Sequence, residues 1–403
     1  MRKIREQALE LHKQAKGKLS VELKVGLKDA HDLSLAYSPG VAEPCTEIHQ
    51  DPGKIYDYTI KGNLVGVISD GSAVLGLGNI GGAASMPVLE GKAALFKAFA
   101  NVDAFPIALN TTDPEEIIKI VKAMEPTFGG INLEDISAPN CFIIEERLKK
   151  EMNIPVFHDD QHGTAIVTAA GLINALKVVN KKLEDITIVI NGAGAAGIAI
   201  AKLLHGMGVY DIILCDTKGS IYQGRTYGMN TVKESIARIT NKNKVSGNLD
   251  EVIEAADVFI GVSVAGALTQ GMIGQMNEKP IVFAMANPNP EIMPAEAIAA
   301  GAAVIGTGRS DLPNQVNNVL AFPGIFKGAL RVLASEINEE MKLAAVYAIA
   351  DLVGPEDLTQ DYVIPNAFDT RVAEAVSYAV AKAAVATGVA RRRLDATAAT
   401  VII

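Results

Sequence analysis

Short apolar runs alternate with helix-like segments through the first 160 residues of the chain. The runs that predict buried strands are 64–69, 105–109, 130–133 and 156–157, and the helical patterns are 87–100, 114–124 and 138–150. Alternation of this kind is typical of a mostly parallel sheet with helices on its faces. We therefore expect an α/β domain over residues 1–160.

A second series of the same kind follows a long apolar helix predicted from Gln161 to Val179. Its expected strands are 186–190, 211–215, 258–262, 281–286 and 303–306, with helices between them. The helix that begins at Gln161 is expected to bridge the two series, so we place the domain boundary near that residue. Residues 161–325 then form a second α/β domain. Residues 326–403 form a helical segment, with patterns at 324–334, 338–352 and 370–387, that is expected to pack on one of the two domains.

The chain begins with a helical pattern of a different kind. From Met1 to Gly17, the apolar residues Ile4, Ala8, Leu11 and Ala15 recur at helical spacing among charged and polar residues. This pattern predicts an amphipathic helix and differs from that of a signal peptide. Its apolar stripe needs a surface on which to pack.

Composition and charge exclude several classes of function. The 403 residues carry 37 Lys and Arg against 46 Asp and Glu, and this acidic balance lacks the basic footprint of nucleic-acid binding. The three cysteines Cys45, Cys141 and Cys215 are far apart, which favours reduced thiols in a cytoplasmic protein. The most apolar long stretch, 344–352, is shorter than the roughly 20 residues that span a bilayer, so no membrane segment is expected.

A Gly-x-Gly-x-x-Gly motif occurs at Gly192, Gly194 and Gly197. It follows the strand 186–190 and opens a helix, and the next strand ends in Asp216, which is the context of a dinucleotide-binding turn. The residues expected to contact the pyrophosphate are Gly192, Gly194, Ala195, Ala196 and Gly197. A second copy at 76–81 lacks this context, and it indicates either a substrate-side loop or a glycine-rich turn that packs on the sheet.

The residue at the end of the second Rossmann strand bears on cofactor choice. Asp216 is expected to accept hydrogen bonds from ribose hydroxyls and to repel a 2′-phosphate, which favours NAD over NADP. Lys218 and Arg225 follow closely, and either cation could turn toward a 2′-phosphate and make NADP acceptable.

Two acidic pairs end neighbouring strands of the first series. Glu134-Asp135 follows 130–133 and Asp159-Asp160 follows 156–157, and in a parallel sheet these strand ends face one crevice. Converging carboxylates without cysteine suit a hard cation, Mg²⁺ or Mn²⁺. Two alternatives remain: Asp159-Asp160 could cap the following helix, and His158 with His162 could build a transition-metal site. His162 is otherwise expected to be a neutral, hydrogen-bonding histidine.

These features define the expected fold class, which is α/β. It comprises an N-terminal α/β substrate and metal domain and a Rossmann-type doubly wound dinucleotide-binding domain, followed by C-terminal helices.

Several longer motifs, in this order and spacing, resemble the malic enzymes. They are Ala36-Tyr37-Ser38-Pro39-Gly40-Val41, Leu75-Gly76-Leu77-Gly78-Asn79-Ile80-Gly81, Asn132-Leu133-Glu134-Asp135-Ile136, residues 157–165, residues 190–197, Met285-Ala286-Asn287-Pro288-Asn289-Pro290-Glu291 and residues 317–324. The resemblance covers about residues 15–385, and the length is similar to that of the short prokaryotic form.

The resemblance implies oxidation of (S)-malate to pyruvate and CO₂ with a nicotinamide cofactor and a divalent cation, in a homodimer. It implies that Tyr37 is the general acid and Lys92 the general base. Glu134, Asp135 and Asp160 would be metal ligands, Asn287 and Asn318 would contact malate, Asn287 could also contact the nicotinamide, and Asp159 and His162 would support the site. The sequence departs from the larger animal-type enzymes at Ala73, where those carry an arginine that binds the substrate carboxylate.

The implied chemistry sets requirements for the two catalytic residues. A base must take the proton of the hydroxyl at carbon 2 while hydride leaves, so Lys92 is expected to have a pKa lowered by burial and by a nearby cation. A phenol such as Tyr37 can then protonate carbon 3 of enolpyruvate. The rival interpretations are an oxaloacetate decarboxylase, a non-decarboxylating 2-hydroxy acid dehydrogenase and a noncatalytic NAD(H) sensor.

Overall fold

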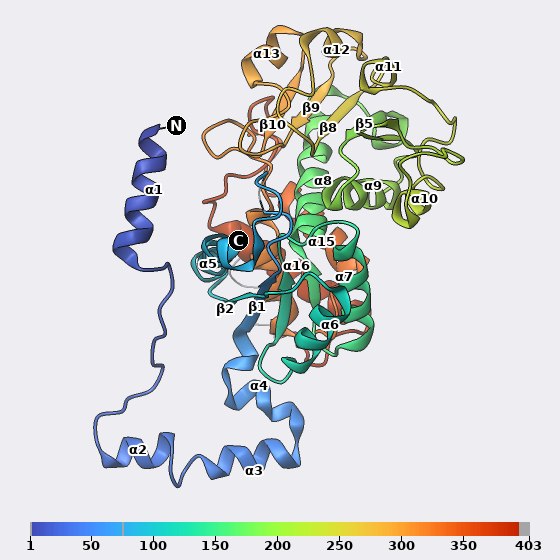
Figure 1. Cartoon of the computed structure of the whole chain (residues 1–403). Helices are drawn as coiled ribbons and strands as arrows, with labels where there is room; N and C mark the ends of the chain where they lie inside the picture. The colour runs from blue at the N-terminus through green and yellow to red at the C-terminus, as the bar shows by residue number, and fades with distance from the viewer. Residues whose placement is uncertain (1, 75, 395–403) are drawn as a thin grey trace.

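The computed structural model describes residues 2–74 and 76–394 and contains two sheets on either side of a long helix (Figure 1). The first sheet has four parallel strands in the order β2-β1-β3-β4. Its strands are β1 (Leu64–Ser69), β2 (Asp103–Ala108), β3 (Gly130–Leu133) and β4 (Val156–His158), and its helices are α5 (Gly81–Ala100), α6 (Pro114–Ala123) and α7 (Asn140–Glu151). The parallel α/β arrangement expected for this half is confirmed.

The second sheet has six strands in the order β10-β9-β8-β5-β6-β7, of which only the short β7 is antiparallel to its neighbour. The strands are β5 (Thr187–Asn191), β6 (Asp211–Asp216), β7 (Gly219–Ser220), β8 (Val258–Gly261), β9 (Ile281–Ala284) and β10 (Val304–Thr307). Its helices are α9 (Ala195–Gly206), α10 (Thr231–Ile236), α11 (Leu249–Val252), α12 (Gln270–Gln275) and α13 (Pro294–Ala299). Because β5 lies between β6 and β8, the strand order reverses there, which gives a Rossmann-type switch point at the carboxyl end of β5.

The long helix α8 (Asp159–Val179) lies between the two sheets (Figure 1). It begins two residues before the predicted start at Gln161, so both acidic residues lie in its first turn, where the helix dipole favours negative charge. Its 21 residues are long and apolar enough to cross a bilayer, but 72% of its most apolar window is buried inside the protein. Helix α8 is longer than the apolar stretch 344–352 singled out from the sequence, and its apolarity reflects its place in the core.

Helix α5 also begins earlier than its pattern predicted. The expected start was Pro87, but the helix begins at Gly81 and Pro87 lies inside it. The reason is tertiary: a Cβ on Gly82 would lie 2.4 Å from the carbonyl oxygen of Leu109, so the glycine lets the helix start directly against the end of β2.

Three C-terminal helices complete the core that the two sheets share. These are α14 (Phe322–Arg331), α15 (Glu339–Ala350) and α16 (Arg371–Ala386). Helix α14 contacts α5 and α15 contacts α8, and all belong to one continuous apolar cluster. The ring of Phe322 packs edge-on against Phe96 of α5, with 4.7 Å between centroids. The helices thus contact elements on both sides of the predicted boundary at residue 161, while the domain limits themselves stay a prediction.

Residues 2–50 form an arm whose helices extend away from the two sheets (Figure 1). Between the first two of these helices the arm touches the body, where Lys18 contacts Glu90 of α5 and Lys24 pairs with Asp103 of β2. This N-terminal arm contains α1 (Arg2–Ala15), α2 (Ala30–Ala36) and α3 (Ala42–Gln50), and the chain returns to the body through α4 (Ile55–Tyr58) and the 3-10 turn η2 (Ile60–Asn63). The amphipathic helix expected at the N-terminus is present as α1. Neither α2 nor α3 buries any residue within the described chain.

The buried amide of Asn174 gives a stability prediction. It donates from Nδ2 to the carbonyl oxygens of Ala350 and Val363, at 2.8 and 3.1 Å, and so ties α8 to the C-terminal region. Asn174→Ala leaves both buried carbonyls without this donor, and we expect it to destabilise the fold by about 1 to 3 kcal/mol. The midpoint of thermal unfolding, followed by circular dichroism, should fall. Gln275→Ala, which removes an exposed amide, is the control and should leave the midpoint unchanged.

Candidate active site

Four carboxylates meet where β3 and β4 end. Leu133 pairs with His158 across the two strands, so Glu134 and Asp159 follow at the same level of the sheet. Oxygen atoms of Glu134, Asp135 and Asp160 all lie within 4.8 Å of one another. The backbone N–H of Asp135 donates to Oδ2 of Asp160 at 2.8 Å, which joins the two strand ends directly.

Lys92 lies at the centre of this group. It comes from α5, is almost completely buried, and places Nζ 2.6 Å from Oδ2 of Asp159 and 2.9 Å from Oε1 of Glu134. On the other side, the ammonium lies 4.4 Å from the centroid of the Phe322 ring. The structure therefore brings five of the predicted site residues together: Lys92, Glu134, Asp135, Asp159 and Asp160.

The charges of this cluster do not balance, since four carboxylates face one ammonium. Burial alone would lower the pKa of Lys92, but the charges of Asp159 and Glu134 outweigh it and raise the pKa. This direction is opposite to the one expected from the sequence. Burial also raises the pKa of Asp159, to about 8, although Lys92 opposes this. A buried excess of negative charge is costly and favours a bound cation.

The donor set fits a hard divalent cation. Among the described residues, the group of three possible ligands contains only carboxylates and no histidine or cysteine. Asn132 donates from Nδ2 to Oε2 of Glu134 at 2.9 Å and so orients that carboxylate. Within the described part of the chain, the buried Oδ1 of Asp159 has no hydrogen-bond partner. The side chain of Asp160 is one-third exposed, so the group opens to solvent on one side.

The capping alternative for the second acidic pair is wrong. Helix α8 has no side-chain hydrogen bond at its N-cap, and the carboxylates of Asp159 and Asp160 instead accept from Lys92 and from the backbone of Asp135. Of the two histidines considered for a transition metal, only His158 lies near the cluster, with Nε2 3.4 Å from Oδ2 of Asp160. Burial lowers the pKa of His158, which keeps the ring neutral near pH 7.

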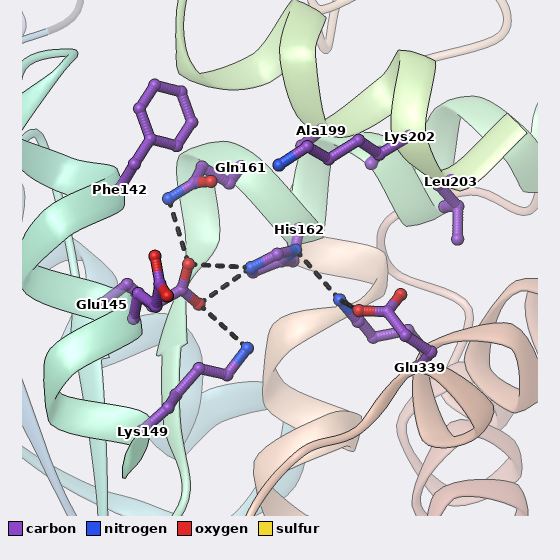
Figure 2. A pocket seen from close by; sticks show the side chains of 12 residues that line it. Phe142, Glu145, Lys149, Gln161, His162, Ala199, Lys202, Leu203 and Glu339 are labelled. Atoms are coloured by element: carbon purple, nitrogen blue, oxygen red, sulfur yellow. Dashed lines mark hydrogen bonds and ion pairs between the residues drawn. The ribbon is translucent and has the colours of Figure 1, made fainter. Parts of the chain in front are cut away.

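His162 faces a separate pocket (Figure 2). Its Nε2 lies 2.8 Å from Oε1 of Glu145, and its Nδ1 lies 3.3 Å from Nζ of Lys342. Burial lowers the pKa of His162 to about 4, so the ring is neutral. Glu145 also accepts from the backbone of His158 and from Gln161. His162 thus contacts none of the three clustered carboxylates, and it braces the start of α8 through Glu145.

Of the two predicted asparagines, Asn318 lies beside the first turns of α8 and Asn287 lies at the end of a strand of the second sheet. Asn318 begins a short 3-10 turn that packs closely on α8, because a Cβ added to Gly163 would lie 3.0 Å from the Cβ of Asn318. Gly163 is one helical turn along α8 from Asp159. Asn287 follows β9 and is exposed. A Cβ on Gly76 would lie 2.8 Å from the carbonyl oxygen of Asn287, so the first glycine loop packs against the end of β9. This loop joins the two halves at the crevice.

Tyr37 is not brought to the cluster. It ends α2 in the N-terminal arm, and its side chain is 67% exposed. In Figure 1, α2 lies well apart from β1 and α8. Segments that are separated in one view are at least that far apart in space. The acid implied by the resemblance is therefore remote from the base in the same chain.

The second glycine motif has the geometry of a dinucleotide-binding turn. Gly192 has a φ of +121°, and a Cβ there would lie 2.4 Å from the carbonyl oxygen of Val262. A Cβ on Gly197 would lie 1.8 Å from the carbonyl oxygen of Gly192, so only glycine allows α9 to start this close to β5. A Cβ on Gly194 would meet no atom within 4 Å, which leaves open space above the N-terminus of α9.

Asp216 ends β6 as predicted, but it already has cationic partners. Arg225 donates to both carboxylate oxygens, and Nζ of Lys233 lies 2.6 Å from Oδ2. The backbone N–H of Lys218 donates to Oδ1 at 2.8 Å. Burial opposes ionisation, but the hydrogen bonds of Arg225 and Lys233 outweigh it and lower the pKa of Asp216 to about 2. The carboxylate is therefore ionised and largely neutralised.

Sequence reasoning missed three residues of these sites. Asn132 lies inside a motif quoted for the resemblance and could have been found, since it precedes Glu134 by two residues and the alternation of a strand puts such residues on one face. Phe322, which faces Lys92, lies inside a motif quoted for the resemblance but carried no assigned role. Lys233 gave no local signal, because it stands 17 residues beyond Asp216 and reaches it only through the fold.

Comparisons with known proteins agree with this arrangement. Residues 16–149 match the malic enzyme N-terminal domain, and residues 161–385 match the malic enzyme NAD-binding domain. The bifunctional malic/malolactic enzyme of Bacillus subtilis is 68% identical over 97% of this chain and 96% of its own length. The NADP-dependent malic enzyme of Haemophilus influenzae is 53% identical over 97% of this chain, which spans 54% of that longer protein.

A solved structure gives the same result in three dimensions. The crystal structure of an NAD-dependent malic enzyme from Thermotoga maritima superposes with a TM-score of 0.90 at 52% identity, over 93% of this chain and 98% of that one. Sequence and structure thus agree over both sheets and the helix between them. On these grounds the chain belongs to the malic enzyme family.

Proposed function

We propose that this protein oxidises (S)-malate at carbon 2 and decarboxylates the product to pyruvate and CO₂, with reduction of a nicotinamide cofactor. The observation that carries the proposal is the buried group of four carboxylates around Lys92 at the ends of β3 and β4. The glycine turn at Gly192 supports it, since it suits a dinucleotide at the switch point of the neighbouring sheet. Family membership and the names of the relatives agree with this reaction.

Glu134, Asp135 and Asp160 would hold Mg²⁺ or Mn²⁺. When bound, the cation would act as a Lewis acid toward the substrate oxygens and would weaken, by its charge, the hold of the carboxylates on the Lys92 proton. Lys92 acts as a base only after its ammonium has lost its own proton, and the neutral amine takes the proton of the hydroxyl as hydride leaves carbon 2 for the nicotinamide ring. Asp159 fixes the position of the Lys92 amine, and Phe322 shields it from water.

Loss of CO₂ leaves enolpyruvate, which must gain a proton at carbon 3. Tyr37 is the proposed donor, and Asn287 and Asn318 are the proposed contacts to malate. A cytoplasmic location is proposed as well, and it agrees with three cysteines that are all free thiols in the structure.

One experiment separates this activity from its rivals. NADH formation and CO₂ release from malate are followed together, with and without Mn²⁺. Coupled, cation-dependent production of both supports the proposal. Formation of NADH without CO₂ would indicate a simple 2-hydroxy acid dehydrogenase. Release of CO₂ from oxaloacetate, without oxidation of malate, would indicate an oxaloacetate decarboxylase. The absence of both products would indicate a noncatalytic NAD(H) sensor.

We further propose that NAD is preferred over NADP. Asp216 offers a carboxylate to the ribose hydroxyls at the end of β6, and a 2′-phosphate there would meet its charge. Arg225 and Lys233 reduce that repulsion, because both already pair with Asp216. The preference for NAD over NADP is therefore expected to depend on the carboxylate of Asp216, since two cationic side chains that could bind a 2′-phosphate are present nearby.

Removing the charge of one proposed cation ligand tests the metal assignment. Asp135 has a φ of +53°, so Asp135→Asn is the suitable change, because asparagine tolerates this backbone and removes the charge. We expect malate oxidation to fall by about 100-fold or more and Mn²⁺ binding, measured by titration calorimetry, to weaken in parallel. NADH binding should survive. Glu184→Gln, which neutralises an exposed carboxylate, should change nothing. Full activity in the presence of EDTA would refute the metal assignment.

A second prediction tests the base. Lys92→Ala should lower kcat for malate oxidation by about 10² to 10⁴, the range typical of a lost general base. Lys97→Ala, on the exposed side of the same helix, is the matched control and should remain active. Partial recovery of the Lys92→Ala enzyme by added methylamine would support the assignment. If Lys92→Ala is correctly folded and oxidises malate at the normal rate, Lys92 is not the base.

A third prediction tests cofactor choice. Asp216→Ser removes the carboxylate and releases Arg225 and Lys233 toward a 2′-phosphate. The ratio of kcat/KM with NAD to that with NADP should fall by about tenfold to hundredfold, or reverse. Asp211→Ser, at the opposite end of β6, is the control. Better use of NADP than of NAD by the unaltered protein would contradict the proposed preference.

A further inference from the structure

Glu291 is completely buried at the carboxyl edge of the second sheet, and the chemistry described above gives it no part. Its Oε1 accepts from the backbone N–H of Ser263 at 2.8 Å and from the hydroxyl of the same residue at 3.0 Å. Its Oε2 accepts from the backbone N–H of Ala286 at 3.0 Å. A carboxylate is costly to bury, so three donors aimed at this one offset the loss of its water.

The neighbouring strand end is shaped to receive this carboxylate. Gly261 is the last residue of β8, and a Cβ added to it would lie 2.3 Å from the carboxyl carbon of Glu291. A glycine in a strand often marks such a close approach of another group. The backbone of Glu291 is held as well, because its carbonyl oxygen accepts from the N–H of Leu268 at 3.2 Å.

Glu291 bridges the loops that leave two neighbouring strands. Strands β8 and β9 are parallel and pair directly (Figure 1), so their carboxyl ends lie at the same edge of the sheet. Ser263 lies two residues beyond the end of β8, and Ala286 lies two residues beyond the end of β9. Ala286 directly precedes Asn287, so the bridge fixes the backbone that carries the proposed malate contact.

A second link leads from Ser263 to the dinucleotide turn. Nδ2 of Asn191 donates to Oγ of Ser263 at 3.0 Å, and Asn191 is the last residue of β5, directly before Gly192. Hydrogen bonds therefore run from the end of β5 through Ser263 to Glu291 and on to Ala286. This is the edge at which the strand order reverses, where open α/β sheets bind their ligands.

The side chain of Asn287 lies among glycines. A Cβ on Gly308, just beyond β10, would lie 3.0 Å from Nδ2 of Asn287, and a Cβ on Gly76 would lie 2.8 Å from its carbonyl oxygen. Glycine at these two positions leaves room for Asn287 but offers no side chain to hold its amide. The place of the amide therefore depends on the backbone that Glu291 fixes.

We propose that Glu291 is a positioning residue for malate, which sets the place of the Asn287 amide by holding the N–H of Ala286 beside the end of β8. Through Ser263 and Asn191 it also keeps this amide in a fixed place relative to the dinucleotide turn. The inference rests on the proposed function, in which Asn287 contacts malate. Glu291 itself touches neither malate nor the proton that is transferred.

The test is a double-mutant cycle on the KM for malate. Glu291→Gln keeps the size of the side chain but replaces one acceptor oxygen by an amide group, which cannot accept from the N–H that it faces. We expect the KM for malate to rise about tenfold to hundredfold. In the Asn287→Ala protein the same change should raise the KM by less than about twofold, because the residue through which Glu291 acts is gone.

Two controls separate positioning from a general loss of structure. Mn²⁺ binding to the Glu291→Gln protein, measured by titration calorimetry, should be unchanged, because the proposed cation ligands belong to the other sheet. Glu296→Gln, which neutralises an exposed carboxylate on α13, should leave the KM for malate unchanged.

Ser263→Ala is a milder variant that serves if Glu291→Gln does not fold. It removes the hydroxyl donor but keeps the backbone N–H, and it should raise the KM for malate by about twofold to tenfold. If the folded variants leave the KM unchanged, or if their full effect persists in the Asn287→Ala protein, Glu291 does not act through Asn287 and the inference is refuted. A normal KM for malate in Asn287→Ala alone would remove that contact from the proposed function and this role of Glu291 with it, while the assignments of Lys92 and the cation would stand.

Discussion

The buried contact between Lys92 and the carboxylates of Glu134 and Asp159 is the interaction on which the site depends. It joins three elements that are distant in the sequence: α5, the end of β3 and the first turn of α8. One ammonium cannot compensate four carboxylates, and burial prevents water from screening the remainder. The same imbalance is costly for the folded chain and is the feature that supports the proposed cation site.

Helix α8 transmits this constraint to the rest of the protein. Its first turn carries Asp159 and Asp160, and its later turns pack between the sheets and hold the C-terminal helices through Asn174. Glu145 and His162 brace the first turn from a separate pocket (Figure 2). A neutral His162 suits this role, because it donates to the Glu145 carboxylate without bringing a further charge near the clustered carboxylates.

The dinucleotide site contains one feature that acts locally, the glycine turn, and one whose effect depends on the fold, Asp216. The glycine spacing at 192–197 has the same consequence in the sequence and in the structure. Gly192 and Gly197 act through close backbone contacts with Val262 and with Gly192, and Gly194 leaves open space at the start of α9. Asp216 differs. Its carboxylate meets Arg225 and Lys233, so its electrostatic effect on a ribose or a phosphate depends on partners that a local motif does not include.

The sequence alone determined the alternation of strands and helices, the Rossmann-type half, the glycine turn and the convergence of Glu134, Asp135, Asp159 and Asp160. These follow from short-range rules: period and turn residues place the strands, and parallel pairing brings their carboxyl ends to one edge. Only the tertiary structure decided the raised pKa of Lys92, the pairing of Asp216 with two cations, the place of His162 in a separate pocket beside Glu145 and the exposure of Tyr37. Each of these depends on contacts, or on missing contacts, between segments far apart in the chain, and no local pattern of residues encodes such distances.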